Sequence, residues 1–447
     1  MVYLRQLVVR VNNGLFALVL LSLSVPGMAA DKTSSDAAPA ALPDPLSLKQ
    51  AIEFSDNNHP DLEIATSHLD RSEANFRATK ADKGFDLSLN AYGQSVDPAN
   101  GTPGPVGDSM ATILLTKPLY DFGKTGNRIA AAQAQLEGEW SRYFNARQQR
   151  RLDIMSLFFD VLLADLRYRV DDETMARTYV TYDRIRKRHD LGQVSDVVLM
   201  EYESRYREAL SKRVASDAKR RATRARLAIG MNRPDELADN LTPPILDDLD
   251  RQVPDYDKVI ANVLKSNPVV IAMRYEVNAA EKSLRSAKAF SRPELDLELE
   301  ASQFERPIGL RNDARAGVVM KWPIYQGGAK RAKVVEADAN LREKRALLTR
   351  TENVLRQKTL ELLQKIDELQ YQRKASKVLV DYRDLKLDQS RALYEMEARA
   401  TLGDAMIGVT DAQWRAARVN YQLALAWAQL KALSGELVEK TAKEKYR

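Results

Sequence analysis

The residues Gly123-Lys124-Thr125 could end a phosphate-binding loop. Such a loop holds phosphates only when another glycine precedes the first of these residues by five positions and a strand leads into it. Position 118 is Pro118, so the pattern fails. We expect no nucleotide chemistry at this point of the chain.

Other catalytic or metal chemistry has little support. The sequence has no cysteine, which excludes disulfides, thiolate zinc sites, cysteine nucleophiles and a lipidated cysteine. His59, His68 and His189 are too far apart in sequence for a local metal site, and we expect each on a helix surface. The protein is therefore predicted to be no enzyme and to need no cofactor.

The net charge of +6 raises the question of nucleic acid. The basic clusters at residues 184–188 and 219–221 are interleaved with acids in predicted helices, which is typical of a solvated coiled-coil face. Residues 1–30 carry two arginines, no acid and an apolar run of about 12 residues before Met28-Ala29-Ala30, the pattern of a secretory signal peptide. Without it, 66 basic and 62 acidic residues remain, and nucleic acid is not an expected partner.

The chain contains the same unit twice. Residues 118–123, Pro-Leu-Tyr-Asp-Phe-Gly, recur 205 positions later as Pro-Ile-Tyr-Gln-Gly-Gly at residues 323–328. Repeats define the fold when they occur. The predicted organisation is a signal peptide (1–30), a flexible segment (31–45), a first repeat (46–240), a second repeat (241–437) and a charged tail (438–447).

Each repeat contains two predicted strands. They lie at about 86–94 and 110–117 in the first copy and at 294–302 and 314–322 in the second. Apolar and polar residues alternate in them, with Asp296, Glu298 and Glu300 opposite leucines. A soluble sandwich does not explain this pattern. Leucines facing lipid and acids facing a water-filled lumen do.

Four strands per chain are too few for a closed barrel, and an open sheet edge is not tolerated in lipid. Several copies must therefore pool their strands. The alternative is two small solvent-facing hairpins on a helical body. If the barrel interpretation holds, rings of Asp296, Glu298 and Glu300 line the lumen and favour cations.

One helix is predicted before each strand pair, and a long helix is predicted after it. The first long helix runs to about residue 190, roughly 100 Å at 1.5 Å per residue. Its apolar residues follow a 3-or-4 spacing, which indicates coiled-coil packing. The chain then turns at 191–195 and returns, and the second copy turns near 397–401.

This arrangement resembles the outer-membrane factor family, of which TolC is the best-known member. The resemblance rests on residues 48–52 and 58–62, the two Pro-Leu/Ile-Tyr-x-x-Gly boxes, the Leu191-Gly192-x-Val194 turn and residues 430–435, in this order. It implies a mostly α-helical chain with a membrane β-barrel: a homotrimer with a 12-stranded barrel in outer-membrane lipid, on a periplasmic α-helical coiled-coil barrel. It also implies docking on an inner-membrane transporter through a periplasmic adaptor.

The resemblance assigns roles to residues at the helical tips. The adaptor is expected at Leu191, Gly192, Gln193, Val194 and Ser195, and at Glu397, Ala398, Arg399, Ala400 and Thr401. A periplasmic gate is expected from Tyr394, Arg399 and Asp196, with Asp404 and Asp411 as the acids of its ring. The family commonly has glycine at both tips, whereas Glu397 stands at the second, and the gate acids fit in more than one register.

Two functions follow from these patterns. The first is an outer-membrane exit duct for a tripartite efflux pump or a type I secretion system. The second is a periplasmic coiled-coil adaptor or scaffold, which would have one helical hairpin flanked by β-rich segments. Duplicated hairpins with strands inside each unit favour the duct.

Overall fold

The computed structural model describes residues 42–56, 59–97, 104–306, 312–396 and 402–438. The predicted signal peptide lies outside the described residues, as do residues 397–401 and 439–447. The first copy consists of α1 (Leu48–Asp56), α2 (Pro60–Ala81), β1 (Asp86–Tyr92), β4 (Met110–Tyr120), α3 (Lys124–Asp190) and α4 (Asp196–Gly230), with the short β2 (Ser95–Val96) and β3 (Val106–Gly107) between β1 and β4. The second copy consists of α5 (Tyr256–Ser266), α6 (Pro268–Ala289), β5 (Glu294–Phe304), β6 (Ala314–Lys321), α7 (Ala329–Glu395) and α8 (Leu402–Leu433).

The strands form one antiparallel sheet in the order β1-β4-β5-β6. Leu115 of β4 lies opposite Leu87 of β1 on one side and Leu299 of β5 on the other, and Leu299 faces Ala316 of β6. This register puts the apolar residues of all four strands on one face. The sheet is open, with β1 and β6 as its edges.

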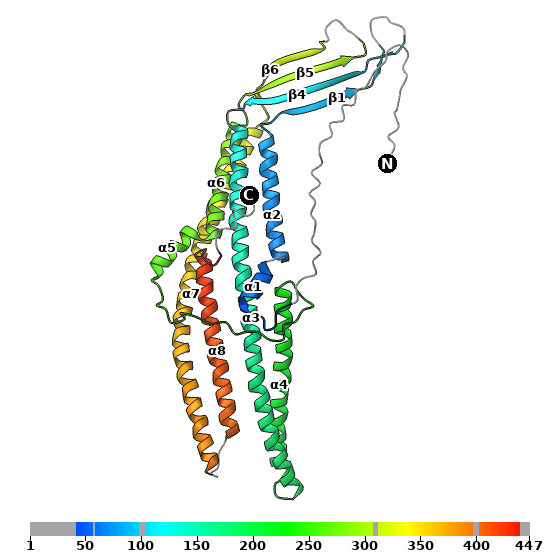
Figure 1. Ribbon diagram of the computed structural model, residues 1–447. Helices are drawn as coiled ribbons and strands as arrows, with labels where there is room; N and C mark the ends of the chain where they lie inside the picture. Colours follow the sequence, from blue (N-terminus) through cyan, green and yellow to red (C-terminus); the bar gives the residue numbers. More distant parts are fainter. Residues whose placement is uncertain (1–41, 57–58, 98–103, 307–311, 397–401, 439–447) are drawn as a thin grey trace. The chain divides into compact units, whose positions relative to one another are not determined.

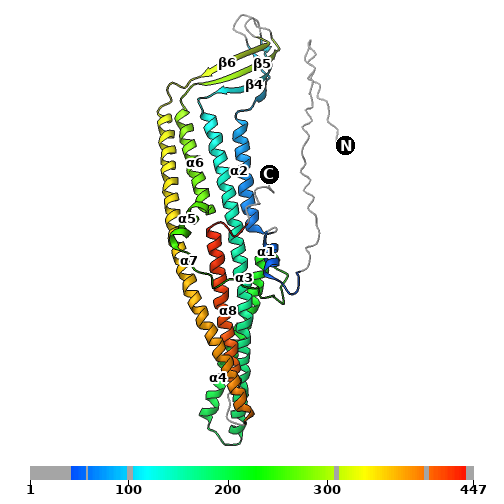
Figure 2. The same cartoon turned by 60° about the vertical axis from the view of Figure 1, so that its left-hand side comes forward.

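The helices run away from one end of the sheet (Figures 1 and 2). In the half nearest the sheet, α3 packs against α2 and α6, and α6 packs against α7. In the other half, α3 pairs with α4 and with α8, while α7 pairs with α8. At 67 residues each, α3 and α7 extend for roughly 100 Å. No described helix combines the length and the hydropathy needed to cross a membrane.

Glycines of the repeated boxes make the turn from strand to long helix. Gly123 precedes α3 with φ of 82°, and Gly328 precedes α7 with φ of 87°. Both values lie in the left-handed region, which glycine enters without a steric penalty. Asp121 then accepts a hydrogen bond from the Thr125 backbone N–H at 2.6 Å and caps the start of α3. The repeated box is thus a junction between sheet and helix.

Two apolar clusters hold the helices together midway along their length. In the first copy, Phe158 and Ile154 of α3 are fully buried with Leu227 of α4 and Leu46. In the second copy, Ile366 and Leu369 of α7 pack with residues of α5 and α8. The 3-or-4 spacing of apolar residues read from the sequence corresponds in part to buried side chains, because Leu152, Phe159, Leu162 and Val170 of α3 are buried as well. Core packing is concentrated where the short helices meet the long ones.

Two expectations about the start of each copy were wrong. The sequence suggested one helix before each strand pair, but the chain has two, divided at Pro60 and at Pro268. Proline is favoured in the first turn of a helix because it lacks an N–H, so each proline starts a new helix. His59 is buried and not on a surface. Its Nδ1 accepts a hydrogen bond from the Asp61 N–H at 3.1 Å, and burial, aided by the charge of Arg150, lowers the pKa of His59.

Candidate functional site

The sheet has one polar and one apolar face. Asp296, Glu298 and Glu300 alternate along β5 and share a face with Thr112 and Thr116 of β4. The opposite face carries large apolar side chains that nothing else in the described chain covers. Leu87 and Leu89 are 65% and 69% exposed, and Val318 and Met320 are 61% exposed each. Such a face is stable only against an apolar environment.

The acidic face also contains two cations that the sequence reasoning missed. Arg315 of β6 contacts Glu300 at 2.6 Å, and Lys321 contacts Asp296 at 3.2 Å and Glu298 at 3.4 Å. The two cations could have been predicted on this face, because Arg315 and Lys321 are an even number of positions apart in the same predicted strand and therefore point to the same side. The polar face of β5 and β6 therefore carries three negative and two positive charges, so it is less acidic than predicted.

Aromatic side chains gather where the sheet meets the helices. Phe85, Tyr120, Trp322 and Tyr325 are all more than half exposed, and they flank the ends of β1, β4 and β6. Lys117, on the apolar face, places its Nζ 4.3 Å from the centre of the Phe85 ring. Aromatic and lysine side chains with an apolar body and a polar tip are typical of a membrane–water interface.

The far ends of the hairpins are exposed turns. Gly192 adopts φ of 72°, and a side chain placed there would meet nothing within 4 Å. Around it, Leu191 is 72% exposed, and Val197 and Met200 are 77% and 62% exposed. The second predicted tip, Glu397 to Thr401, lies outside the described residues. Next to it, Met396 and Tyr394 are 76% and 65% exposed.

The predicted gate residues that the structure describes lie on α4, α7 and α8. Asp196 lies 2.6 Å from His189 Nε2 within its own hairpin, and this hydrogen bond raises the pKa of His189. Arg399 lies outside the described residues, so the predicted pairing of Arg399 with Asp196 stays a prediction. Tyr394 reaches solvent near the end of α7.

Asp404 and Asp411 instead contact α3 in the same chain. Asp404 lies 3.3 Å from Arg177, and Asp411 lies 3.8 Å from Arg167. Between these pairs, the Thr410 hydroxyl donates to Glu173 at 2.8 Å. These contacts join the two hairpins along a line that we call the α3–α8 seam. Asp411 also pairs with Arg415 of its own helix at 2.7 Å. Sequence reasoning found the two acids but not their partners on α3, which are more than 200 residues away.

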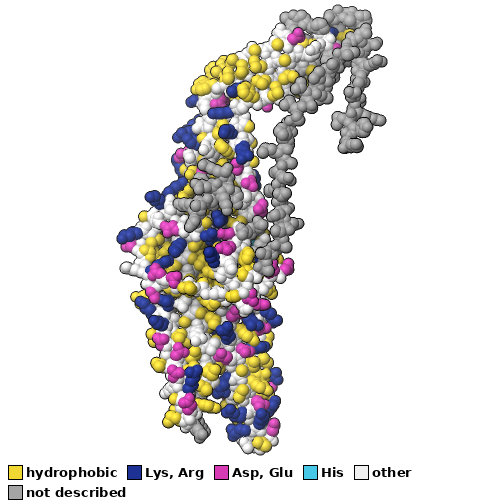
Figure 3. All heavy atoms as spheres, viewed as in Figure 1, with side chains coloured by type: hydrophobic (Ala, Val, Ile, Leu, Met, Phe, Trp, Pro, Cys, Tyr) yellow, Lys and Arg dark blue, Asp and Glu magenta, His cyan; other side chains and the backbone are white. Residues whose placement is uncertain are grey.

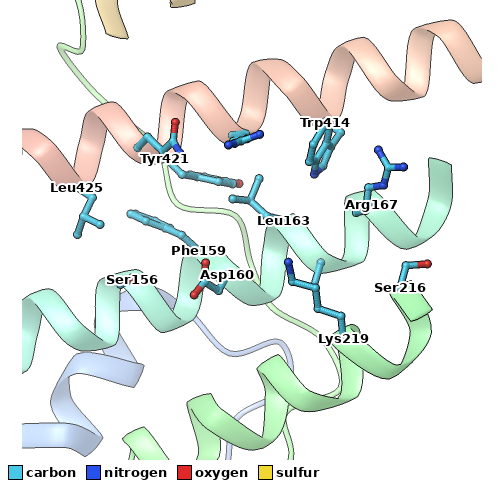
Figure 4. Close-up of a pocket in the computed structure, with 13 residues that line it drawn as sticks. Ser156, Phe159, Asp160, Leu163, Arg167, Ser216, Lys219, Trp414, Tyr421 and Leu425 are labelled. Carbon is cyan, nitrogen blue, oxygen red and sulfur yellow. The ribbon is translucent and has the colours of Figure 1, made fainter. Parts of the chain in front are cut away.

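The α3–α8 seam changes character toward the middle of the helices. The guanidinium of Arg167 lies 5.1 Å from the centre of the Trp414 ring, and farther on Phe159 stacks on Tyr421 with ring centres 4.7 Å apart (Figure 4). A cavity of about 460 Å³ opens here between α3, α4 and α8. Asp160 lines this cavity, and the partial loss of solvent around its carboxyl group raises the pKa of that group, although the residue is exposed on one side. Polar contacts near the tips thus give way to aromatic packing.

No metal site accompanies these features in the described ranges, where His, Asp and Glu side chains form no group of three or more that could hold an ion. The comparison with known families is decisive. A family model described as outer membrane efflux protein matches residues 52–231 and 259–436, one segment in each copy. The chain belongs to this family. Its two matched segments include the long helices and the strands.

The chain is also similar to two curated proteins. The chain is 26% identical over 261 residues to the outer membrane efflux protein BepC of Brucella suis, covering 57% of this chain and 55% of BepC. It is 24% identical over 328 residues to the protein CyaE of Bordetella pertussis, covering 69% of this chain and 67% of CyaE. The match thus spans about half the length of BepC.

Solved structures establish the fold. The CmeC outer membrane channel of Campylobacter jejuni matches with a TM-score of 0.74 at 14% identity, covering 89% of this chain and 88% of that one. The outer membrane protein VceC of Vibrio cholerae matches with a TM-score of 0.71 at 17% identity, covering 88% and 97%. The predicted fold class is confirmed. Two hairpins with strands inside each copy also distinguish this efflux protein from the adaptor alternative, which required one hairpin.

Proposed function

We propose that the protein is the outer-membrane exit duct of a tripartite efflux or type I secretion system. The observation that carries the proposal is the open four-stranded sheet with one uncovered apolar face, joined in the same chain to two helices of 67 residues. Lipid requires that sheet edges be closed, so the edges β1 and β6 need strands of other copies. Three chains would supply twelve strands.

The polar face of the sheet would then line the exit. This face carries the three acids and two cations of β5 and β6, and Asp86 of β1 adds a fourth acid, so negative charge is in excess. Charged rings in a pore select ions by their sign. The duct would therefore favour cations weakly and would catalyse no reaction, with the energy for transport coming from the inner-membrane transporter.

The tips would dock the periplasmic adaptor, at Leu191 to Ser195 and at Glu397 to Thr401. Exposed Leu191, Val197 and Met200 support this part of the proposal, because exposed apolar side chains grouped at a helical turn are typical of interaction sites. Gly192 leaves space for a partner at the turn itself.

The gate would depend on the α3–α8 seam. Arg177 with Asp404, and Arg167 with Asp411, hold α8 against α3 in each chain. Partly exposed ion pairs are weak, about 0.2–1 kcal/mol each, so an adaptor could separate them. Tyr394, Arg399 and Asp196 would add contacts nearer the tips, as the family resemblance implies.

The direct test is reconstitution of the full-length protein in a planar lipid bilayer, combined with gel electrophoresis of unheated samples from outer-membrane fractions. We expect discrete conductance steps and a heat-sensitive band at three times the chain mass. Chemical crosslinking in whole envelopes, followed by purification, should recover an adaptor and an inner-membrane transporter. A monomer that fractionates with soluble periplasmic proteins and forms no pores would refute the duct.

A further inference from the structure

Positive charge is concentrated where the sheet meets the helices. We call residues 75–85, 117–128, 284–293 and 322–333 the junction segments, because each contains or directly adjoins an end of a sheet strand and the neighbouring end of a helix. They contain twelve Lys and Arg and only two Asp, a net charge of +10. The whole chain carries +6, so the remaining residues are net acidic. Figure 3 shows dark-blue side chains on the helices just below the apolar surface of the sheet.

Several of these cations have no acidic partner. Lys124 pairs with Glu294, and Arg128 pairs with Asp82. Arg285 and Lys288 near the end of α6, and Lys330 and Arg331 at the start of α7, are exposed, and the described residues offer none of these four an ion pair. Four exposed, uncompensated cations at one level of the protein repel one another, which calls for an anionic partner.

The neighbouring surfaces indicate which anion. The junction segments themselves contain the exposed aromatic residues Phe85, Tyr120 and Trp322, and the uncovered apolar face of the sheet lies directly beside them. The order apolar, aromatic, cationic is the order of acyl chains, interface and phosphate headgroups at one leaflet of a membrane. The cationic and aromatic side chains also touch directly, since Lys333 Nζ lies 3.5 Å from the centre of the Phe290 ring.

We propose that the junction segments bind the headgroups of anionic phospholipids in the periplasmic leaflet of the outer membrane. Arg285, Lys288, Lys330 and Arg331 form the part of this surface contributed by α6 and α7. The proposal rests on the proposed membrane position of the sheet and adds a partner of defined chemistry. Phospholipid bound there would neutralise the +10 charge and fix how deeply the sheet sits in the bilayer.

The effect is large enough to measure. A Lys or Arg close to an anionic membrane surface changes binding roughly fivefold at low salt. Arg285→Gln, Lys288→Gln, Lys330→Gln and Arg331→Gln in one protein remove four such contributions. The matched control is the fourfold variant Arg350→Gln, Arg356→Gln, Lys358→Gln and Lys377→Gln, which removes the same charge from exposed positions of α7 farther from the sheet.

The full-length proteins are extracted from outer membranes in mild detergent, and the phosphatidylglycerol and cardiolipin retained per chain are compared with phosphatidylethanolamine by mass spectrometry. We expect wild type and control to retain anionic lipid above its share in the bulk extract. The junction variant should lose at least about fivefold of this enrichment. A wash in 1 M NaCl should lower the enrichment of wild type as well, because salt screens exposed charges.

Pore formation by the same samples separates this proposal from the duct. Wild-type protein without anionic lipid enrichment, or equal loss in both variants, would overturn lipid binding even if conductance is normal. A junction variant that keeps its lipid but shifts the reversal potential would show that these cations line the lumen, which also overturns it. If the junction variant does not insert, the salt wash of wild-type protein decides alone. Absence of pores in wild type would instead count against the duct.

Discussion

Replacing Arg177 with glutamine should open the periplasmic end of the protein. Arg177 Nε lies 3.3 Å from Asp404 Oδ1, and the side chains are 36% and 55% exposed. Glutamine keeps the length of much of the side chain but removes the charge. Because Asp404 is exposed, losing its partner leaves no buried charge behind. The change removes the attraction between α3 and α8, together with a hydrogen bond from Arg177 to Thr181 of the same helix.

The expected size follows from this exposure. An exposed pair contributes about 0.5 kcal/mol, the middle of the range for such pairs. If three chains open together, the closed state loses about 1.5 kcal/mol, which raises the ratio of open to closed channels roughly tenfold. Single-channel recording in a planar bilayer measures this ratio directly.

Two further variants test whether the contact itself matters. Arg186→Gln is the matched control, because Arg186 also lies on α3 but pairs with Asp183 of the same helix. Exchanging the charges, with Arg177→Asp and Asp404→Arg together, should restore closure. An unchanged open fraction in Arg177→Gln, in trimers of normal abundance, would show that this pair does not hold the channel closed.

Four other outcomes are expected. Leu299→Lys, midway along β5 on the apolar face, should cost about 2–4 kcal/mol of stability in a bilayer, and urea unfolding in vesicles measures this loss. Unchanged stability would contradict the assigned apolar face. Asp296→Asn, Glu298→Gln and Glu300→Gln together leave Arg315 and Lys321 uncompensated, so the reversal potential in a salt gradient should change from cation to anion preference, and unchanged selectivity would refute the assigned face. Gly192→Trp should abolish export with normal trimer level, while Gly192→Asn, which tolerates positive φ, should keep it; loss of the trimer would make the residue structural. The hydrogen bond to Asp196 raises the pKa of His189, so the stabilisation of the tip by this pair is complete below the ordinary histidine pKa and is lost as pH rises through the raised value. NMR titration should show a lower His189 pKa in Asp196→Asn than in wild type. An equal pKa in both proteins would exclude the pairing.

Much of the fold could be predicted from the sequence, because the residue patterns that specify its strands and turns are local. Strict alternation in residues 294–300 predicts a strand with two faces, and the strand β5 begins at Glu294. Each repeated box lies between a predicted strand and a predicted long helix, and its glycines Gly123, Gly327 and Gly328 adopt positive φ at that junction. The division of each first helix was missed because His59 and Asn267 were not recognised as helix caps before proline.

The candidate site was less accessible because its contacts are distant in sequence. Nothing in the spacing of Asp404 predicts that Arg177 is its partner, since the two lie on different hairpins. Phe159 and Tyr421 are likewise brought together only by the packing of α8 on α3. The pairing of Arg315 with Glu300 could have been predicted, because both strands alternate and their polar residues must share a face.

The stacked rings of Phe159 and Tyr421 can act as a pivot about which α8 rotates relative to α3. Tyr421 and Asp404 are 17 residues apart on α8, so the ion pair lies roughly 25 Å along the helix from the stack. Pivoting α8 about the stack by about 10° would move Asp404 by roughly 4 Å, more than the present separation of its charged atoms from Arg177. The aromatic contact would hardly change. A small force on the tip therefore breaks the ion pair of Asp404 with Arg177 first. The aromatic core around Phe159 and Tyr421 can stay packed while the end of α8 moves.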